Sequence, residues 1–290
     1  MTPRSSDLVR ALLLGLAASL LLTLVACSRV GLAYRNLDMI IPWSLDDYLQ
    51  MSDEQRAFFD ERLDEHLLWH CSQELPRYRD WLASLQQMSR SEELDPQQMQ
   101  ARFDEAREAI DAIARQITPT TIELLRDLDD AQVRQLEEAL RKDIDERRKE
   151  HLQPPVSEQI ADRAERMEKR LATWYGRLTQ AQKARVRQWS EALGNQNQQW
   201  IDNRAQWHAR LLQTLQTRDQ ADFPERISAL MQQRQQYWTP EYRRIFAAAE
   251  VQARELLRDV HLMAEPRQRA HLHKRLDDLQ RELAEIPCQA

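Results

Sequence analysis

Glycine is nearly absent from this chain of 290 residues, which contains only four. Gln, Glu, Arg, Leu and Ala dominate instead, and their side chains lose little conformational freedom in a helix. Such a composition, with apolar residues at helical spacing, is typical of long helices. The mean hydropathy of −0.72 indicates narrow apolar stripes. We therefore predict an all-α fold, an elongated bundle of long amphipathic helices with a thin core, and we find no strand pattern.

The first 26 residues differ in kind from the rest. Arg4 and Arg10 lead into an uncharged apolar run that extends from Ala11 to Ala26. A basic start followed by a short apolar run and small residues predicts a cleaved secretory signal peptide over residues 1–26. The alternative is a permanent membrane helix, but the run is shorter than the ~20 residues that a helix needs to cross a bilayer.

The end of this run resembles the lipobox of bacterial lipoproteins. Leu24, Val25 and Ala26 precede Cys27, in the pattern of one apolar and then small residues before a cysteine. The resemblance implies that Cys27 receives a diacylglyceryl group, becomes the new N-terminus and is acylated again, as with palmitate. Ser28, where an aspartate would resemble an inner-membrane signal, implies the inner leaflet of the outer membrane, facing the periplasm. The alternative is an ordinary cleaved signal with an unmodified cysteine.

Two cysteines remain after Cys27, namely Cys71 and Cys288. In an oxidising compartment such a pair is a disulfide candidate. The alternative is two separate thiols, because sequence alone does not bring the two Cα atoms within bridging distance.

The chain beyond the signal peptide divides into a lead-in and two helical parts. Residues 27–51 form a lipid-anchored lead-in that is too apolar for a floating tether. Gln153-Pro154-Pro155 is the strongest break, so we predict helical subdomains over 52–152 and 153–290. Within them, Pro76 is expected to kink or break a helix and Pro119 to end one. The longest helix is expected to run from Thr179 towards Leu215.

Four helix starts share one pattern, in which an apolar residue, a capping residue and a glutamine stand at fixed spacing. Ser, Thr or Asp caps the free amide groups, and the glutamine three residues later returns the bond. This capping role is one interpretation. The pattern also resembles the Leu-Thr-x-x-Gln repeats of helical periplasmic chaperone and stress proteins, which implies a shared compartment and architecture. The four copies are Met51-Ser52-x-x-Gln55, Leu94-Asp95-x-x-Gln98, Leu128-Asp129-x-x-Gln132 and Leu178-Thr179-x-x-Gln182.

Residues 27–80 resemble an uncharacterised family of helical lipoproteins from Gram-negative bacteria, for which the resemblance implies no activity. Cys71 departs from the family pattern, which has a basic residue there. The matching residues are Tyr34, Asn36, Leu37, Asp38, Trp43, Asp47, Tyr48, Trp69, His70, Glu74, Leu75, Pro76 and Tyr78.

Few residues suggest chemistry. His66 and His70 stand one helical turn apart and are weak metal candidates, but two ligands do not close a site. We find no nucleophile–base arrangement and no phosphate loop, so we expect neither an enzyme nor a cofactor.

The tryptophans suggest binding instead. Trp189, Trp200 and Trp207 are expected along one line of the longest helix, where they form either a core stripe or an aromatic groove for a partner, and Trp43 is a further candidate.

We therefore expect a lipid-anchored periplasmic binding protein that acts as a scaffold, a chaperone-like factor or an envelope-assembly subunit. Its expected partners are the membrane, through the anchor, and a protein client. The net charge of −6 gives no electrostatic footprint for nucleic acid. The alternatives are a metal sensor or metal-dependent enzyme that uses His66 and His70, and a passive structural lipoprotein.

Overall fold

The structure is a computed structural model that describes residues 29–288, and all regular elements in that range are helical. The predicted all-α fold of long amphipathic helices is confirmed. The signal peptide, Cys27 and Ser28 lie outside the described residues. The helices are α2 (Arg29–Arg35), α3 (Leu37–Asp46), α4 (Asp53–Trp69), α5 (Leu75–Met88), α6 (Pro96–Arg126), α7 (Asp130–Leu152), α8 (Val156–Tyr175), α9 (Gln180–Leu193), α10 (Gln196–Leu215), α11 (Phe223–Gln232), α12 (Pro240–Leu262) and α13 (Pro266–Ala284).

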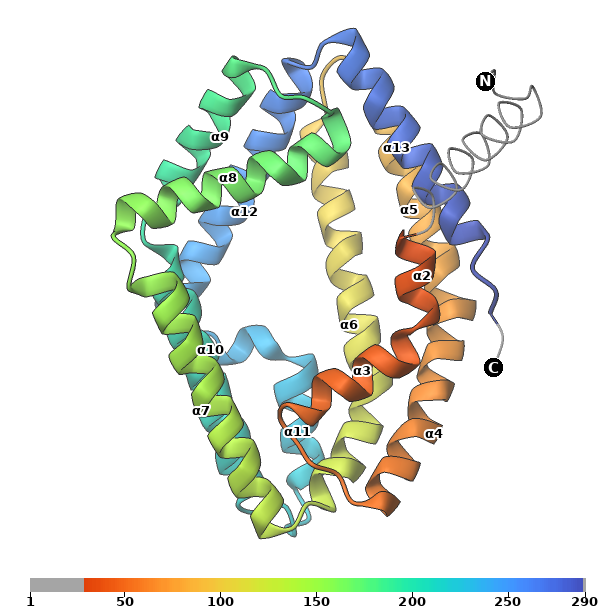
Figure 1. The fold of residues 1–290 in the computed structure, drawn as a ribbon, viewed down its shortest axis with the longest axis vertical. Coiled ribbons are helices and arrows are strands. Elements are labelled where there is room, and N and C mark those ends of the chain that lie inside the picture. The colour runs from red at the N-terminus through yellow and green to blue at the C-terminus, as the bar shows by residue number, and fades with distance from the viewer. Residues whose placement is uncertain (1–28, 289–290) are drawn as a thin grey trace, which may run out of the picture.

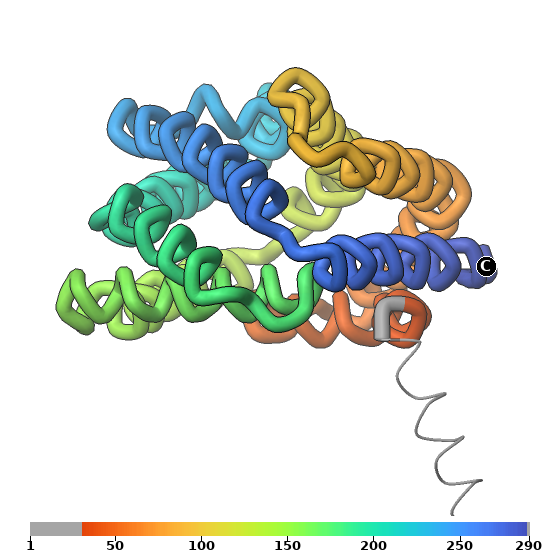
Figure 2. Tube along the Cα trace, turned by 90° about the horizontal axis from the view of Figure 1, so that it is seen from above, coloured from red at the N-terminus to blue at the C-terminus, as the bar shows by residue number. Residues whose placement is uncertain are grey.

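The helices pack as pairs around the rim of the molecule (Figure 1). Most partners are distant in sequence: α10 lies on α7, α11 on α6, α12 on α9 and α13 on α5. The two ends of the described chain meet, since α13 also contacts α2 (Figure 2). Within residues 29–288, no helix is both long enough and apolar enough to cross a membrane.

Two large apolar cores hold the helices together, and each takes residues from both sides of residue 153. The first joins Phe59 and Leu136 to Leu215 and Phe223. The second joins Leu82 of α5 to residues of α8, α9, α12 and α13. The chain does turn between α7 and α8 at the predicted boundary. The two predicted subdomains nevertheless do not have separate cores, because helices distant in sequence pair across that boundary.

The recurring helix starts cap their helices as predicted. The side chains of Ser52, Asp95, Asp129 and Thr179 each accept a bond from the backbone N–H three residues later. In α4, α7 and α9 the glutamine returns the bond and completes a capping box.

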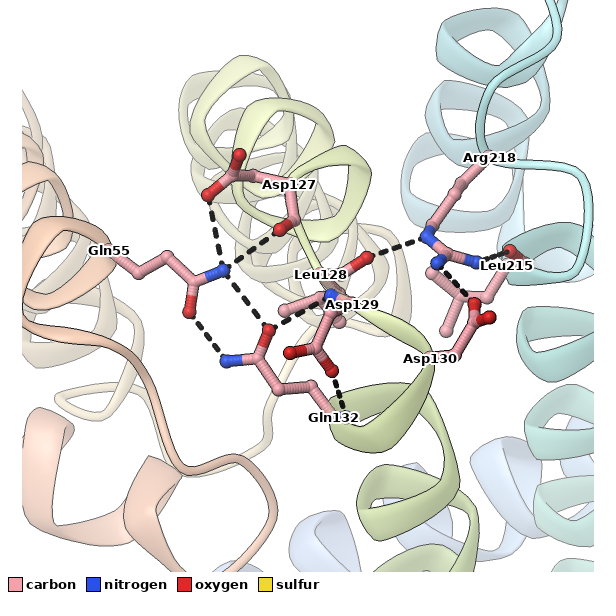
Figure 3. Close-up of polar contacts among 8 residues, drawn as sticks. All are labelled: Gln55, Asp127, Leu128, Asp129, Asp130, Gln132, Leu215 and Arg218. Carbon is pink, nitrogen blue, oxygen red and sulfur yellow. Dashed lines mark hydrogen bonds and ion pairs between the residues drawn. The ribbon is translucent and has the colours of Figure 1, made fainter.

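Two of these glutamines, Gln55 and Gln132, also connect one helix start to another, because their side chains bond between the starts of α4 and α7 (Figure 3). The amide Nε2 of Gln132 donates to Oε1 of Gln55 at 2.6 Å. Gln55 in turn donates to the backbone carbonyl of Asp127 at 3.0 Å. Arg218 fastens the same corner by donating to the carbonyl of Leu128. Two helix starts 77 residues apart are therefore joined through their capping residues.

A second corner of the same kind joins α9 to α13. Gln182 and Gln268 exchange side-chain amide bonds of 3.2 and 2.9 Å. Gln268 also donates to the carbonyl of Arg177, two residues before the Thr179 cap, just as Gln55 does to Asp127 at the first corner. Gln268 belongs to a capping box that begins at Glu265, which the sequence pattern did not include.

The prediction of one helix from Thr179 to Leu215 is wrong, because the chain turns at Gly194. Gly194 has a φ of 51°, a left-handed conformation that glycine adopts without a steric penalty. Arg163, buried on α8, donates to the carbonyls of Ser190 and Gly194 and so satisfies the end of α9. The break separates α9 from α10.

Two predictions from proline also need correction. Pro119 does not end its helix, since α6 continues through it to Arg126. Pro119 and Arg115, whose carbonyl loses its helical partner, are both exposed, so water solvates the gap. Pro76 does not end the helical segment, but the α-helical run is interrupted directly before it. A π-helical turn at His70–Glu74 separates α4 from α5, and Pro76 lies in the first turn of α5, where proline is tolerated.

Candidate functional site

An apolar cavity of about 520 Å³ lies between α3, α4 and α6, and we call it the α3 cavity. Its volume falls within the ~300–1,000 Å³ of sites that bind small ligands. Nearly all of its lining is apolar, with two histidines and two threonines among the lining residues. Each helix contributes apolar side chains to the lining, among them Leu37, Ile41 and Leu45 of α3, Leu63 and Leu67 of α4, and Ile113 and Ile117 of α6.

The sequence explains why these side chains converge. Leu37, Ile41 and Leu45 are four residues apart, so they share one face of α3. Ile113 and Ile117 belong to the apolar stripe of α6 in the same way. α4 packs between these two helices, because it contacts both α3 and α6. The stripes enclose a space that their side chains do not fill.

A second apolar cavity of about 500 Å³ lies between α5, α6, α8, α12 and α13. None of its lining residues belongs to α2 or α3, and it lies against the second core. Among its lining residues are Trp81, Phe103 and Trp174.

His66 and His70 both line the α3 cavity, yet their ring nitrogens are already engaged. Nε2 of His66 lies 2.8 Å from Oγ1 of Thr120. The ring of His70 lies between two tyrosines, with Nδ1 at 3.0 Å from the hydroxyl of Tyr34 and Nε2 at 3.2 Å from that of Tyr78. Burial raises the pKa of Tyr34 to about 12, so the hydroxyl stays protonated. This arrangement fixes the rings as hydrogen-bonding groups of the cavity wall.

The two histidines do not form a metal centre in this geometry. The described part of the chain contains no group of three or more His, Cys, Asp or Glu side chains placed to hold an ion. Either nitrogen of His70 would have to leave its tyrosine hydroxyl before that nitrogen could bind a metal.

Stability should fall as the pH drops from 7 towards 5. Burial lowers the pKa values of His66, His70, His208 and His261 below the usual 6.5. The unfolded chain then binds more protons than the folded one in this window, so acid favours unfolding. Stability from these groups is complete above pH 6.5 and is lost as the pH falls through the lowered values. Thermal unfolding midpoints measured at pH 7.5, 6.5 and 5.5 test this, and an unchanged midpoint at pH 5.5 would contradict it.

The carboxylate of Asp143 does not contribute to this loss of stability between pH 7 and 5. Asp143, buried on α7, binds Arg147 and Arg204 and accepts a bond from Tyr48. Burial alone would raise the pKa of Asp143, but the hydrogen bonds from the two arginines lower it to about 2. Its contribution to stability is therefore lost only below pH 4. No sequence pattern predicts this cluster, because its members come from the lead-in, α7 and α10 and share no motif.

The predicted tryptophan line is not formed, because the turn at Gly194 separates Trp189 from the other two. Trp189 is buried in the second core. Trp207 packs against the first core and donates to the carbonyl of Leu230. Trp200 packs against His151 and under the guanidinium of Arg147. Trp43, in contrast, is 71% exposed on α3.

Cys71 and Cys288 form a disulfide, with Cα atoms 5.4 Å apart across a sequence separation of 217 residues. Of the two alternatives for this pair, the structure contains the bridge. It connects the π-helical turn between α4 and α5 to the segment after α13, beside Tyr34, Tyr78 and Ile286. Cys27 lies outside the described residues.

Residues 47–243 match a family of unknown function, DUF6279. The chain belongs to the DUF6279 family. The match begins directly after α3 and includes the α4, α6 and α7 residues that line the α3 cavity. It confirms the predicted resemblance to an uncharacterised family. No curated protein and no solved structure matches the chain.

Proposed function

We propose that this member of the DUF6279 family is a lipid-anchored binding protein of the bacterial cell envelope, which faces the periplasm and holds an apolar group in the α3 cavity. The observation that carries the proposal is the cavity itself, an apolar space of about 520 Å³ walled on one side by α3. The anchor is supported by the lipobox-like residues Leu24–Cys27 that follow an apolar leader.

The lining favours a group without charge. A charged group would lose its hydration in the cavity and find few partners, which is unfavourable. The polar groups at the wall are committed elsewhere: Thr120 lies within bonding distance of His66, and Thr121 donates to the carbonyl of Ile117. An acyl chain or the apolar side chains of a partner protein fit this lining, and each methylene that leaves water contributes ~0.8 kcal/mol.

Filling the cavity is expected to weaken the binding of a fluorescent fatty acid at least tenfold. In Ile113→Trp the larger side chain occupies space that the probe would take. Ile110→Trp is the matched control, since Ile110 is on the same helix but 50% exposed and outside the cavity. Fluorescence titration measures both affinities, and circular dichroism checks that both variants keep their helices.

Two results would contradict the proposal. One is that the wild-type protein binds no fatty acid and no apolar peptide. The other is equal affinity of the two variants for the probe, which would place the bound probe elsewhere on the protein. The first of these would favour a passive structural lipoprotein. The metal alternative has no comparable support, because the rings of His66 and His70 are engaged by hydroxyl groups.

A further inference from the structure

Helix α3 is apolar on two opposite faces. Leu37, Ile41 and Leu45 face the cavity. Met39 and Trp43 point the other way, roughly half a turn around the helix at ~100° per residue, and Ile40 lies at the edge between the two faces. The three side chains of Met39, Ile40 and Trp43 are 62%, 42% and 71% exposed. Asp38, Ser44 and Asp46 of α3 are also exposed, so the helix is apolar on two faces and polar between them, as expected for a helix that lies at an interface.

This exposure is concentrated in the lead-in helices. Of the ten exposed large apolar side chains among residues 31–288, four lie within twelve residues, because Leu32 of α2 joins the three on α3. The other six are distributed over α4, α6, α8 and α12. Clustered apolar exposure marks an interaction surface, whereas scattered exposure is ordinary. We call Leu32, Met39, Ile40 and Trp43 the lead-in face.

The position of this face in the chain identifies its occupant. α2 begins at Arg29, two residues after Cys27, and two extended residues reach only about 7 Å. A lipid on Cys27 therefore holds the start of α2 close to the surface of the bilayer, and α3 follows α2 after a single residue, Asn36. The composition also fits a lipid interface, where tryptophan is enriched and the apolar face of a helix sinks among the headgroups. Exposed Asp46 and Asp47 end the face within one turn beyond Trp43, which favours shallow insertion over spanning.

We infer that α2 and α3 lie on the membrane surface, with Met39, Ile40 and Trp43 inserted between the lipid headgroups. The inference rests on the proposed anchor and adds an orientation to it. The protein contacts the bilayer through α3, so the α3 cavity is separated from the lipid by the width of that helix. Exposed Arg35, on α2, adds an attraction to anionic headgroups.

Spin-label depth measurements test this orientation. Trp43→Cys offers a free thiol for the label, because Cys27 is acylated in the proposed protein and Cys71 and Cys288 are bridged. The lipidated chain is reconstituted into vesicles of phosphatidylethanolamine and phosphatidylglycerol. Val251→Cys is the control, since Val251 is also exposed and apolar (43%) but lies on α12, away from α3 in Figure 1. We expect label 43 to be more accessible to oxygen than to a water-soluble nickel chelate, and label 251 to show the reverse.

The outcomes separate the orientation from the anchor. If the vesicles carry the protein and label 43 is as accessible to the nickel chelate as label 251, the orientation is wrong and the anchor stands. A label at 43 that is shielded equally without vesicles would indicate contact with a second protein molecule, which also overturns the membrane contact.

Loss of the anchor leaves the orientation testable. Labelled palmitate that enters the wild-type chain but not Cys27→Ser supports the anchor, and equal labelling would end it. In that case residues 28–290 are held on nickel-lipid vesicles by an N-terminal histidine tag. Label 43 in lipid then supports the membrane contact of α3, and label 43 in water refutes it.

Discussion

Serine in place of Cys288 is expected to lower the free energy of unfolding by about 5 kcal/mol. The bridge to Cys71 closes a loop across 217 residues, and such a long loop restricts the unfolded chain strongly. Cys288 is the cleaner of the two positions because it is exposed, whereas serine at buried Cys71 would also bury a hydroxyl group. Urea unfolding followed by circular dichroism measures the difference.

The reductant dithiothreitol supplies the control for this prediction. It should destabilise the wild-type protein to the level of Cys288→Ser and leave that variant unchanged. The double variant with Cys71→Ser should add only the small effect of the buried hydroxyl, since either substitution alone removes the whole bridge. Wild-type protein that keeps its stability after complete reduction would contradict the expected contribution.

Alanine at Gln182 is expected to lower the free energy of unfolding by about 3 kcal/mol, because it leaves buried polar groups without partners. Gln182 is fully buried. Its side chain accepts from the N–H of Thr179 and donates to the carbonyl of Val260. It also exchanges two bonds with Gln268. Urea unfolding of the two proteins measures the loss.

Gln98 is the matched control, because it holds the same position in the capping pattern at the start of α6. Its side chain is exposed and joins no second helix start. Gln98→Ala should therefore change the stability by less than about 0.5 kcal/mol. Since Gln98 returns no bond to its cap, equal destabilisation by both substitutions would mean that the capping and corner bonds of Gln182 add nothing measurable to stability.

The sequence was sufficient for the helical class and for most helix starts. Caps are local: Ser52, Asp129 and Thr179 bond to atoms three residues away, so a short pattern contains the whole interaction. The ends of helices were harder to predict. The apolar pattern predicts no break at Gly194, where the chain turns, and Pro119 predicts a helix end although α6 continues through it.

The candidate site was less predictable than the fold. The stripes of α4 and α6 were recognisable, but the volume left between them depends on how three helices meet, which no local pattern contains. The partners of His70 come from residues 34 and 78, on two other helices. Trp43 was singled out as a binding candidate without any indication that its neighbours Met39 and Ile40 would share its exposure.

The two corners where helix starts interlock are made largely of neutral amides. Gln55 with Gln132, and Gln182 with Gln268, have no proton to gain or lose in the physiological range, and their bonds are not weakened by counter-ions. Acid and salt should therefore act first on the histidines and the surface ion pairs. The angles between these helices should then persist through osmotic and acid shocks, so that mild stress loosens the cavity walls before it moves the helices that hold them.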